Sequence, residues 1–147
     1  MSKLGDVPFE TTLLVRDTCL CLHTQGAARA LARRFDEALR PAGLTNGQFS
    51  LLLSLNRPDP PSMAPVAALL AMDRTTLTAA LKPLKRRGLV QVSADPDDKR
   101  GRLLCLTREG HALLQKALPI WRQTHAETER LIDGDRLRKG LKALSMC

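Results

Sequence analysis

Aromatic residues are scarce in this chain of 147 residues, and tyrosine is absent. They make up 3% of the sequence, whereas apolar residues as a whole make up 44%. A core built from such a composition is mainly aliphatic, and its many leucines and alanines favour helices. The length suits a single domain spanning residues 1–147, or one subunit of an oligomer.

The sequence also lacks long apolar runs and the pattern of a signal peptide. No segment approaches the ~20 consecutive apolar residues that a membrane-spanning helix needs. The opening residues MSKLGDVPFETTLLVRD do not place a charged segment before an apolar one, as a signal peptide does. We therefore expect a cytoplasmic protein that has no membrane partner.

The cysteines and histidines do not predict a metal site, a cofactor or an enzyme. The cysteines are Cys19, Cys21, Cys105 and Cys147, and no two of them form a Cys-x-x-Cys pair. On a helix, Cys19 and Cys21 would point to opposite sides and could share neither a metal ion nor a disulfide. Cys19 and His23 lie one helical turn apart, but no second pair of ligands accompanies them. The histidines are far apart in sequence and no glycine-rich phosphate loop is present.

Acidic residues are outnumbered, and the excess positive charge is concentrated in one stretch. The chain has 23 basic and 15 acidic residues, a formal net charge of +8. Residues 74–102 contain eight basic and three acidic residues, a net charge of +5 within 29 residues. Such a concentration suggests a polyanionic partner. A solvated helix face is the alternative interpretation of a charge run, so its position in the fold has to decide.

Helical spacing dominates the first part of the chain. Apolar residues recur at helical spacing from Glu10 to Arg40 without an internal proline, which predicts one long helix. Thr45 and Gln48 have the spacing of a capping box at the start of a second helix. Ser62 follows a proline-rich loop and is predicted to start a short third helix.

A capped basic helix follows directly. Asp73 is a favourable N-cap residue, and Leu77, Leu81 and Leu84 share one helical face. Gly88 is predicted to end this helix in the left-handed conformation.

The next residues predict a hairpin and two more helices. Residues 89–94 and 102–106 are typical of strands, and the turn-rich segment DPDDKRG joins them through a charged tip. Thr107 is predicted to cap a long helix whose apolar stripe runs to Ile132. A short helix follows the break at Asp133.

This order of elements predicts a mainly helical fold with a small β-hairpin wing, a winged helix-turn-helix. In that fold the second helix of the motif enters the DNA major groove, and the hairpin tip lies beside it. Arg74 can donate two hydrogen bonds to a guanine, and Arg100 is positioned for a narrow minor groove, with Asp98 orienting its guanidinium group. The residues predicted to contact double-stranded DNA are Arg74, Thr75, Thr76, Thr78, Lys82, Lys85, Asp98, Lys99 and Arg100.

Three segments of the sequence resemble the MarR family of transcriptional regulators: GLTNGQFSLLLSL, MDRTTLTAALKPLKRRGLVQVSADPDDKRGRLLCLTREG and ALPIWRQTHAETE. The most specific part is Asp98-Lys99-Arg100, which is similar to the family's Asp-x-Arg wing signature. The resemblance implies a homodimer, with residues 10–40 and 108–147 forming the dimerisation helices and residues 45–106 the winged helix-turn-helix. It also implies a repressor that a small molecule or an oxidant regulates. Ala79 departs from the family, which often has an arginine at this position.

The resemblance also suggests where a signal would act. A small, mostly apolar effector would bind where the dimer helices meet the winged domain, with Arg16, His23 and Trp121 as lining residues. Cys21 lies at a similar distance before the Gly-Leu-Thr segment as the reactive cysteine of the family's organic-hydroperoxide sensors, but the tyrosines of those sensors are missing here.

Two alternatives to a ligand-regulated repressor follow from these observations. One is a regulator that senses organic hydroperoxide through Cys21, and the other is a helical dimer that does not bind DNA. We expect instead that Cys21 is a small apolar residue packed at the dimer interface, so that dilute peroxide leaves DNA binding unchanged.

Overall fold

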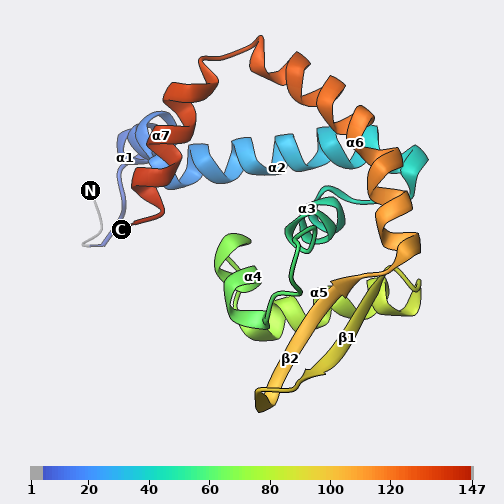
Figure 1. The fold of residues 1–147 in the computed structure, drawn as a ribbon. Coiled ribbons are helices and arrows are strands. Elements are labelled where there is room, and N and C mark those ends of the chain that lie inside the picture. Colours follow the sequence, from blue (N-terminus) through green and yellow to red (C-terminus); the bar gives the residue numbers. More distant parts are fainter. Residues whose placement is uncertain (1–4, 147) are drawn as a thin grey trace. The chain divides into compact units, whose positions relative to one another are not determined.

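The computed structural model describes residues 5–146, and the chain divides into two compact units at the Arg34–Phe35 boundary. The first unit contains α1 (Phe9–Thr18) and most of α2 (Leu20–Leu39). The second contains the end of α2 and the following elements (Figure 1): η1 (Arg40–Ala42), α3 (Asn46–Ser54), α4 (Met63–Leu69), α5 (Arg74–Arg86), β1 (Val90–Asp95), β2 (Asp98–Leu106), α6 (Arg108–Glu129) and α7 (Gly134–Leu144). The predicted mainly helical fold with a β-hairpin is confirmed. Within residues 5–146, no helix combines the length and the apolar character needed to cross a membrane.

The prediction of one helix over residues 10–40 is wrong, because the chain leaves the helical conformation at Cys19. This residue has an extended backbone, with φ −68° and ψ 112°. Its Sγ accepts a hydrogen bond from the Leu22 N–H at 3.4 Å. An N-cap side chain makes this bond to the backbone N–H three residues later, which otherwise has no partner in the helix. Cys19 therefore separates α1 from α2. The argument that placed Cys19 and Cys21 on opposite sides of one helix does not apply.

An aliphatic core holds the second unit together, as the composition predicted. The largest fully buried side chains come from the end of α2 and from α3, α4, α5 and β2, and they are Leu39, Leu51, Leu52, Val66, Leu77, Leu84 and Leu104. Burying a leucine side chain stabilises a fold by about 1.5–3 kcal/mol. These contacts therefore fix the second unit, whereas α1 has no buried residue.

The start of α3 is fixed by two sets of polar contacts. The predicted capping box is present, with the Thr45 side chain and the Gln48 backbone N–H 3.1 Å apart. The Asp36 carboxylate, in the last turn of α2, accepts hydrogen bonds from the Asn46 backbone N–H at 2.7 Å and from its side-chain amide at 2.8 Å. These bonds favour the charged carboxylate and lower the pKa of Asp36.

The joint between α4 and α5 is short and ends in the predicted N-cap. Ala71 adopts the left-handed conformation with φ 52°, which lets the chain reverse direction within a few residues. The Asp73 carboxylate then accepts a hydrogen bond from the Thr76 backbone N–H at 2.7 Å and starts α5. Gly88, with φ 72°, follows the end of α5 in the left-handed conformation that the sequence predicted.

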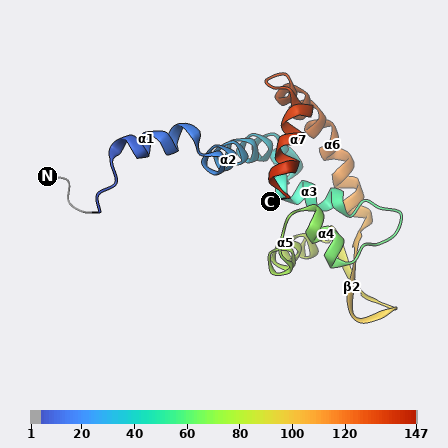
Figure 2. The same ribbon diagram turned by 90° about the vertical axis from the view of Figure 1, so that its left-hand side faces the viewer.

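The wing differs from its prediction because β2 begins at Asp98 rather than at Arg102. The turn is closed by two carboxylates: Asp95 accepts from the Asp97 N–H at 2.9 Å, and Asp98 accepts from the Arg100 N–H at 3.0 Å. Only Pro96 and Asp97 remain in the turn. Figures 1 and 2 both show the hairpin projecting away from α3 in the same unit.

The pairing of the hairpin is irregular near its tip. Ala94 faces Arg102, whereas Asp95 faces Asp98, so residues 99–101 have no partner in register on β1. Such a bulge changes the direction in which a strand presents its side chains. Lys99 and Arg100 are therefore displayed on a strand irregularity rather than on a loop.

Hydrogen bonds fix the base of the hairpin. The Thr107 hydroxyl donates to the Gly88 carbonyl at 2.6 Å, and the Leu104 N–H donates to the Pro61 carbonyl at 2.8 Å. Thr107 also accepts from the Gly110 N–H at 3.0 Å and is the predicted N-cap of α6. These bonds connect the hairpin to the end of α5, to the segment before α4 and to the start of α6.

The end of α6 differs slightly from the predicted apolar stripe. The helix continues through Pro119 but ends at Glu129, so Leu131 and Ile132 lie outside it. The Asp133 carboxylate accepts from the Arg136 N–H at 3.1 Å and starts α7.

Gly110 provides a test of how tightly α6 packs against the start of the wing. A Cβ atom at this position would collide with the backbone carbonyl oxygen of Leu89. We expect Gly110→Ala to lower the free energy of unfolding by about 3 kcal/mol, the upper part of the range for overpacking. Urea denaturation measures this loss. Gly47→Ala, where the added Cβ would lie 3.9 Å from its nearest neighbour, is the matched control and should not be destabilised in this way; equal stability of the two variants would contradict the packing.

Candidate DNA-binding interface

One face of α5 is buried, and this leaves the opposite face exposed. Leu77 and Leu84 are fully buried and Leu81 is 4% exposed, so they form the predicted apolar face. All of the α5 residues predicted to contact DNA are exposed: Arg74, Thr75, Thr76, Thr78, Lys82 and Lys85. The core therefore positions the helix with its polar and basic side outward.

Two of the threonines predicted to contact DNA make hydrogen bonds within α5 or with its N-cap residue. The Thr78 hydroxyl donates to the Arg74 carbonyl oxygen at 2.8 Å, so it faces a ligand as a hydrogen-bond acceptor. The Thr76 backbone N–H is bound by the Asp73 carboxylate, and this bond lowers the pKa of Asp73. The first turn of α5 is thereby held in a defined conformation.

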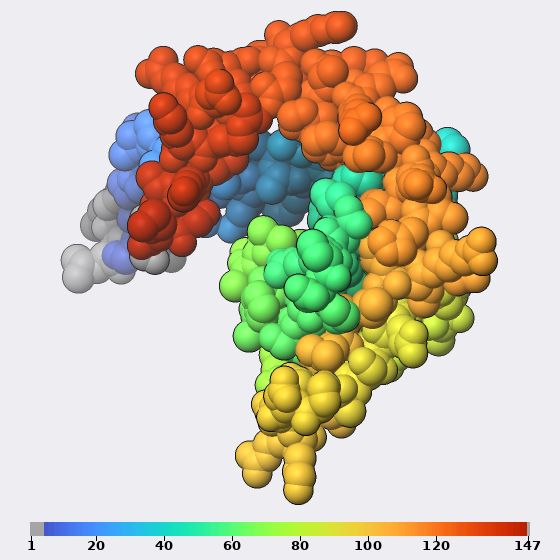
Figure 3. Space-filling model, viewed as in Figure 1, coloured from blue at the N-terminus to red at the C-terminus, as the bar shows by residue number. Residues whose placement is uncertain are grey.

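Asp98 has a different role from the predicted one. Its carboxylate accepts from the backbone N–H of Arg100 and does not orient the guanidinium group of that residue. Lys99 and Arg100 are both exposed. Figure 3 shows the hairpin extending beyond the surface of the neighbouring helices, so its cations lie at a projecting tip.

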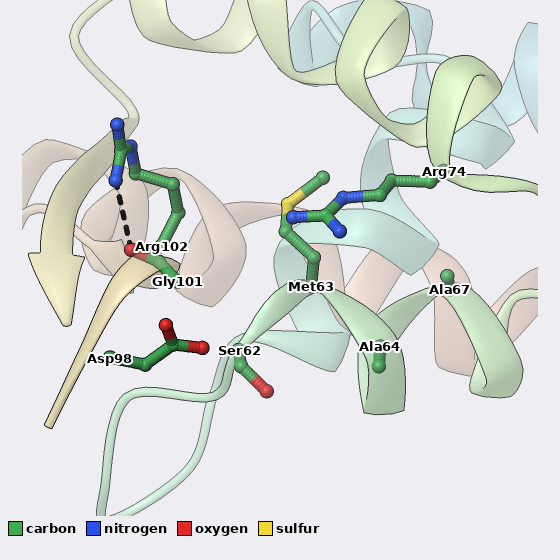
Figure 4. A pocket seen from close by; sticks show the side chains of 8 residues that line it. All are labelled: Ser62, Met63, Ala64, Ala67, Arg74, Asp98, Gly101 and Arg102. Atoms are coloured by element: carbon green, nitrogen blue, oxygen red, sulfur yellow. Dashed lines mark hydrogen bonds between the residues drawn. The ribbon is translucent and has the colours of Figure 1, made fainter.

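The surface along α4, α5 and the wing is hollowed. One hollow of about 280 Å³ is bordered by α4, the start of α5 and β2, and is shown in Figure 4. A second of about 190 Å³ lies between α5 and the hairpin, and a third of about 270 Å³ is bordered by Lys82, Lys85 and Arg86. Basic side chains from two different elements therefore border one continuous side of the unit.

Arg102 lines two of these hollows and was not among the predicted contacts. It is exposed on β2 and shares both hollows with Arg74. The family signature ends at Arg100. The sequence therefore indicated a DNA contact for Arg102 only through its contribution to the local positive charge. The sequence predicted that Arg102 begins the second strand, whereas the structure places it in the middle of β2.

Not every cation of this stretch belongs to the surface. Arg87 donates from Nη1 to the Gly43 carbonyl oxygen at 2.9 Å and connects the end of α5 to the segment before α3. Its charge therefore has a structural role.

The remaining cations of α5 and the wing are not neutralised. Among the described residues, the cations of α5 and β2 have no carboxylate within 4.0 Å, whereas Arg16, Arg40 and Arg138 form ion pairs in other elements. Like charges held together without counter-ions repel each other and attract an anion. This is the electrostatic property expected of a surface that binds a polyanion.

The three residues predicted to line an effector pocket lie in different units. In the first unit, Arg16 pairs with Asp17 at 2.7 Å, which raises the pKa of the guanidinium group, and the His23 Nδ1 lies 2.7 Å from the Cys19 carbonyl oxygen. In the second unit, Trp121 is half-buried between the rings of Phe49 and His125, with centroid distances of 6.0 and 4.6 Å. The shared pocket stays a prediction.

Cys21 is exposed in the chain, and its Sγ accepts a hydrogen bond from the Gln25 amide at 3.1 Å. Its packing at a dimer interface stays a prediction. Within the described range, no three histidine, cysteine or acidic residues come together as a possible metal site.

An α5 helix displayed beside a projecting basic hairpin defines a winged helix-turn-helix domain. Residues 44–101, which contain α5, β1 and the start of β2, match the MarR family. The chain belongs to this family.

Named relatives agree with this assignment. The chain is 40% identical over 80 residues to the transcriptional repressor NicR of Pseudomonas putida, a match that covers 54% of the chain and only 51% of NicR. It is 42% identical to the transcriptional regulator MosR of M. tuberculosis in its complex with DNA, with a TM-score of 0.82 and coverage of 88% of this chain and 95% of MosR. It is 26% identical to BpsR of Bordetella bronchiseptica, whose DNA binding is regulated by 6-hydroxynicotinic acid, with a TM-score of 0.72 and coverage of 88% and 98%.

The cap of α5 leads to a prediction on pH. The pKa of Asp73 is lowered in the folded protein, so its carboxylate stabilises the fold above its ordinary pKa of about 3.9, and this contribution is lost as the pH falls through the lowered value. Asp73→Asn keeps a capping oxygen but cannot titrate. We expect the wild-type protein to lose stability relative to Asp73→Asn between pH 5 and pH 3. Urea denaturation across this range tests it, and parallel pH profiles for the two proteins would contradict it.

Proposed function

We propose that this protein is a homodimeric, sequence-specific DNA-binding regulator of transcription that acts as a repressor and is released by a small molecule. The observation that carries the proposal is the set of exposed, un-neutralised cations on α5 and the wing. A surface of this kind binds DNA phosphates, and the helix between them can read base edges. Such a regulator acts in the cytoplasm, where it meets the DNA.

A dimer is supported by the apolar surface that the single chain leaves uncovered. Leu137, Leu141 and Leu144 are spaced along one face of α7 and are each at least 40% exposed. Exposed apolar stripes of this kind mark protein–protein contacts. We place the dimer contacts within residues 10–40 and 108–147, and the DNA-binding domain within residues 45–106.

Two-fold symmetry determines the form of the DNA site. The α5 helices of a dimer would enter successive major grooves about 10 base pairs apart, so the operator would be a pseudo-palindrome. Release by a small molecule requires that the ligand bind more tightly to the protein state that cannot hold DNA. The proposal of an effector rests on the family and on the ligand-regulated relative.

Dimerisation is tested on the apolar face of α7. Leu141→Asp places a carboxylate in the proposed interface, and an unpartnered buried charge there should cost on the order of 3–5 kcal/mol. We expect a dimer for the wild type and a monomer for this variant in light scattering at micromolar concentration. Lys139→Asp, on the opposite side of the helix, introduces the same residue and should remain dimeric. A monomeric wild-type protein would exclude the proposal.

DNA binding is tested through the wing. Replacing Lys99 with alanine should weaken binding to all sequences alike. It should also reduce the slope of log affinity against log salt by about one for each subunit, because a phosphate contact is lost in each. Arg100→Ala should lose more on operators with an A·T-rich, narrow minor groove than on operators without one. Fluorescence anisotropy with both kinds of duplex at several salt concentrations measures this.

The charge-matched control for the wing is Lys116→Ala, an exposed lysine of α6. It should keep the wild-type salt slope. If the wing variants behave like this control, the wing does not contact DNA.

A further inference from the structure

Two arginines from different elements border the groove between α4, α5 and the wing. Arg74 is the first residue of α5, and Arg102 lies on β2. Both line the 280 Å³ hollow and the adjoining 190 Å³ hollow. In Figure 4 the Arg74 side chain extends toward Met63, and the Arg102 side chain turns toward the Gly101 carbonyl oxygen.

The floor of this groove is small and apolar. Met63, Ala64 and Ala67 come from α4, and Gly101 comes from the bulge of β2. A Cβ at Gly101 would lie 3.0 Å from the Asp95 Cβ and 3.3 Å from the Asp98 Cβ, so a larger side chain there would press against the wing turn. The groove is thus kept open beside the two guanidinium groups.

The charge of the groove favours an anion. Its lining includes two cations and one carboxylate, that of Asp98, which is bonded to the Arg100 N–H. Arg102 donates from Nη1 to the Gly101 carbonyl oxygen at 3.0 Å. Because a guanidinium group has five N–H donors, most of its donors stay available to a ligand.

We infer that this groove seats one phosphate of the DNA backbone between Arg74 and Arg102, with the adjoining deoxyribose against Met63 and Ala67. The inference rests on the proposed function. The DNA backbone combines an anionic group with an apolar sugar, and the groove combines two arginines with an apolar floor. Arginine binds phosphate oxygens with paired N–H donors.

This assignment changes the predicted role of Arg74. An arginine that binds a phosphate positions the protein on the DNA backbone and does not read a guanine edge. Base reading is left to the side chains in the middle of the exposed face, among them Thr75 and Lys82. Arg102 gives the wing a contact that closes the groove from the other side.

The test uses Arg74→Ala, Arg102→Ala and the double variant of the full-length protein. Binding to an operator selected with the wild-type protein, and to a scrambled duplex, is measured by anisotropy over a range of chloride concentrations. Arg122→Ala, which removes an exposed arginine of α6, is the matched control, and thermal melting checks the fold of each variant. Arg102→Lys keeps the charge but loses the paired donors.

We expect each single variant to bind both duplexes about tenfold more weakly, the loss typical of a charge-assisted hydrogen bond. The double variant should lose less than the product of the two single losses. Its salt slope should fall by about 1.8, the value for two phosphates, one in the groove of each subunit of the dimer. Arg102→Lys should keep the wild-type slope while binding more weakly.

Three results would overturn the inference while leaving the proposed function intact. One is an Arg102→Ala variant that behaves like Arg122→Ala. Another is a loss for either single variant that is confined to the operator, which would indicate a base contact. The third is a fall in slope of about 3.6 for the double variant, which would indicate two separate phosphates in each subunit. Failure of the wild-type protein to bind any duplex would instead reject the proposed function itself.

Discussion

The burial of one leucine face of α5 is the constraint on which the DNA-binding unit depends. Leu77, Leu81 and Leu84 lie almost entirely out of water within the aliphatic core. Because successive residues of a helix are about 100° apart, fixing this face also fixes which residues face outward. The polar and basic side of α5 is exposed for this reason and needs no contact of its own. Loss of the apolar face would therefore disorder the exposed surface of α5 as well.

The wing obtains its position from the same core and its shape from two carboxylates. Leu104 and Leu106 bury the inner side of β2, and Thr107 bonds the end of the hairpin to Gly88. At the other end, Asp95 and Asp98 hold the backbone of the tip. Acidic residues at a tip that is proposed to bind DNA phosphates would be unfavourable as free charges. Here they accept hydrogen bonds from backbone N–H groups and form no ion pair with Lys99, Arg100 or Arg102.

Much of this arrangement could be predicted from the sequence because it depends on local chemistry. The capping residues Thr45, Asp73 and Thr107 and the apolar face of α5 follow from spacing within one or two helical turns, and all are confirmed. The break at Cys19 could not be predicted in this way, because a thiol replaces the usual hydroxyl or carboxylate cap. Arg102 was missed because its position depends on a strand register, and that register was set by side-chain bonds within the turn.

Arg102 connects the wing with the helix-turn-helix. The two parts are also joined by protein contacts, since the Leu104 N–H donates to the Pro61 carbonyl oxygen just before α4, and Met63 of α4 lines both hollows that the two arginines border. A phosphate between Arg74 and Arg102 would join the recognition helix to the wing across a gap that protein contacts leave open. DNA would then complete the electrostatic balance of the unit, because the repulsion between the un-neutralised cations is relieved only when an anion arrives. On this reasoning the same charges that make the free protein less stable than it could be are the ones that make it bind.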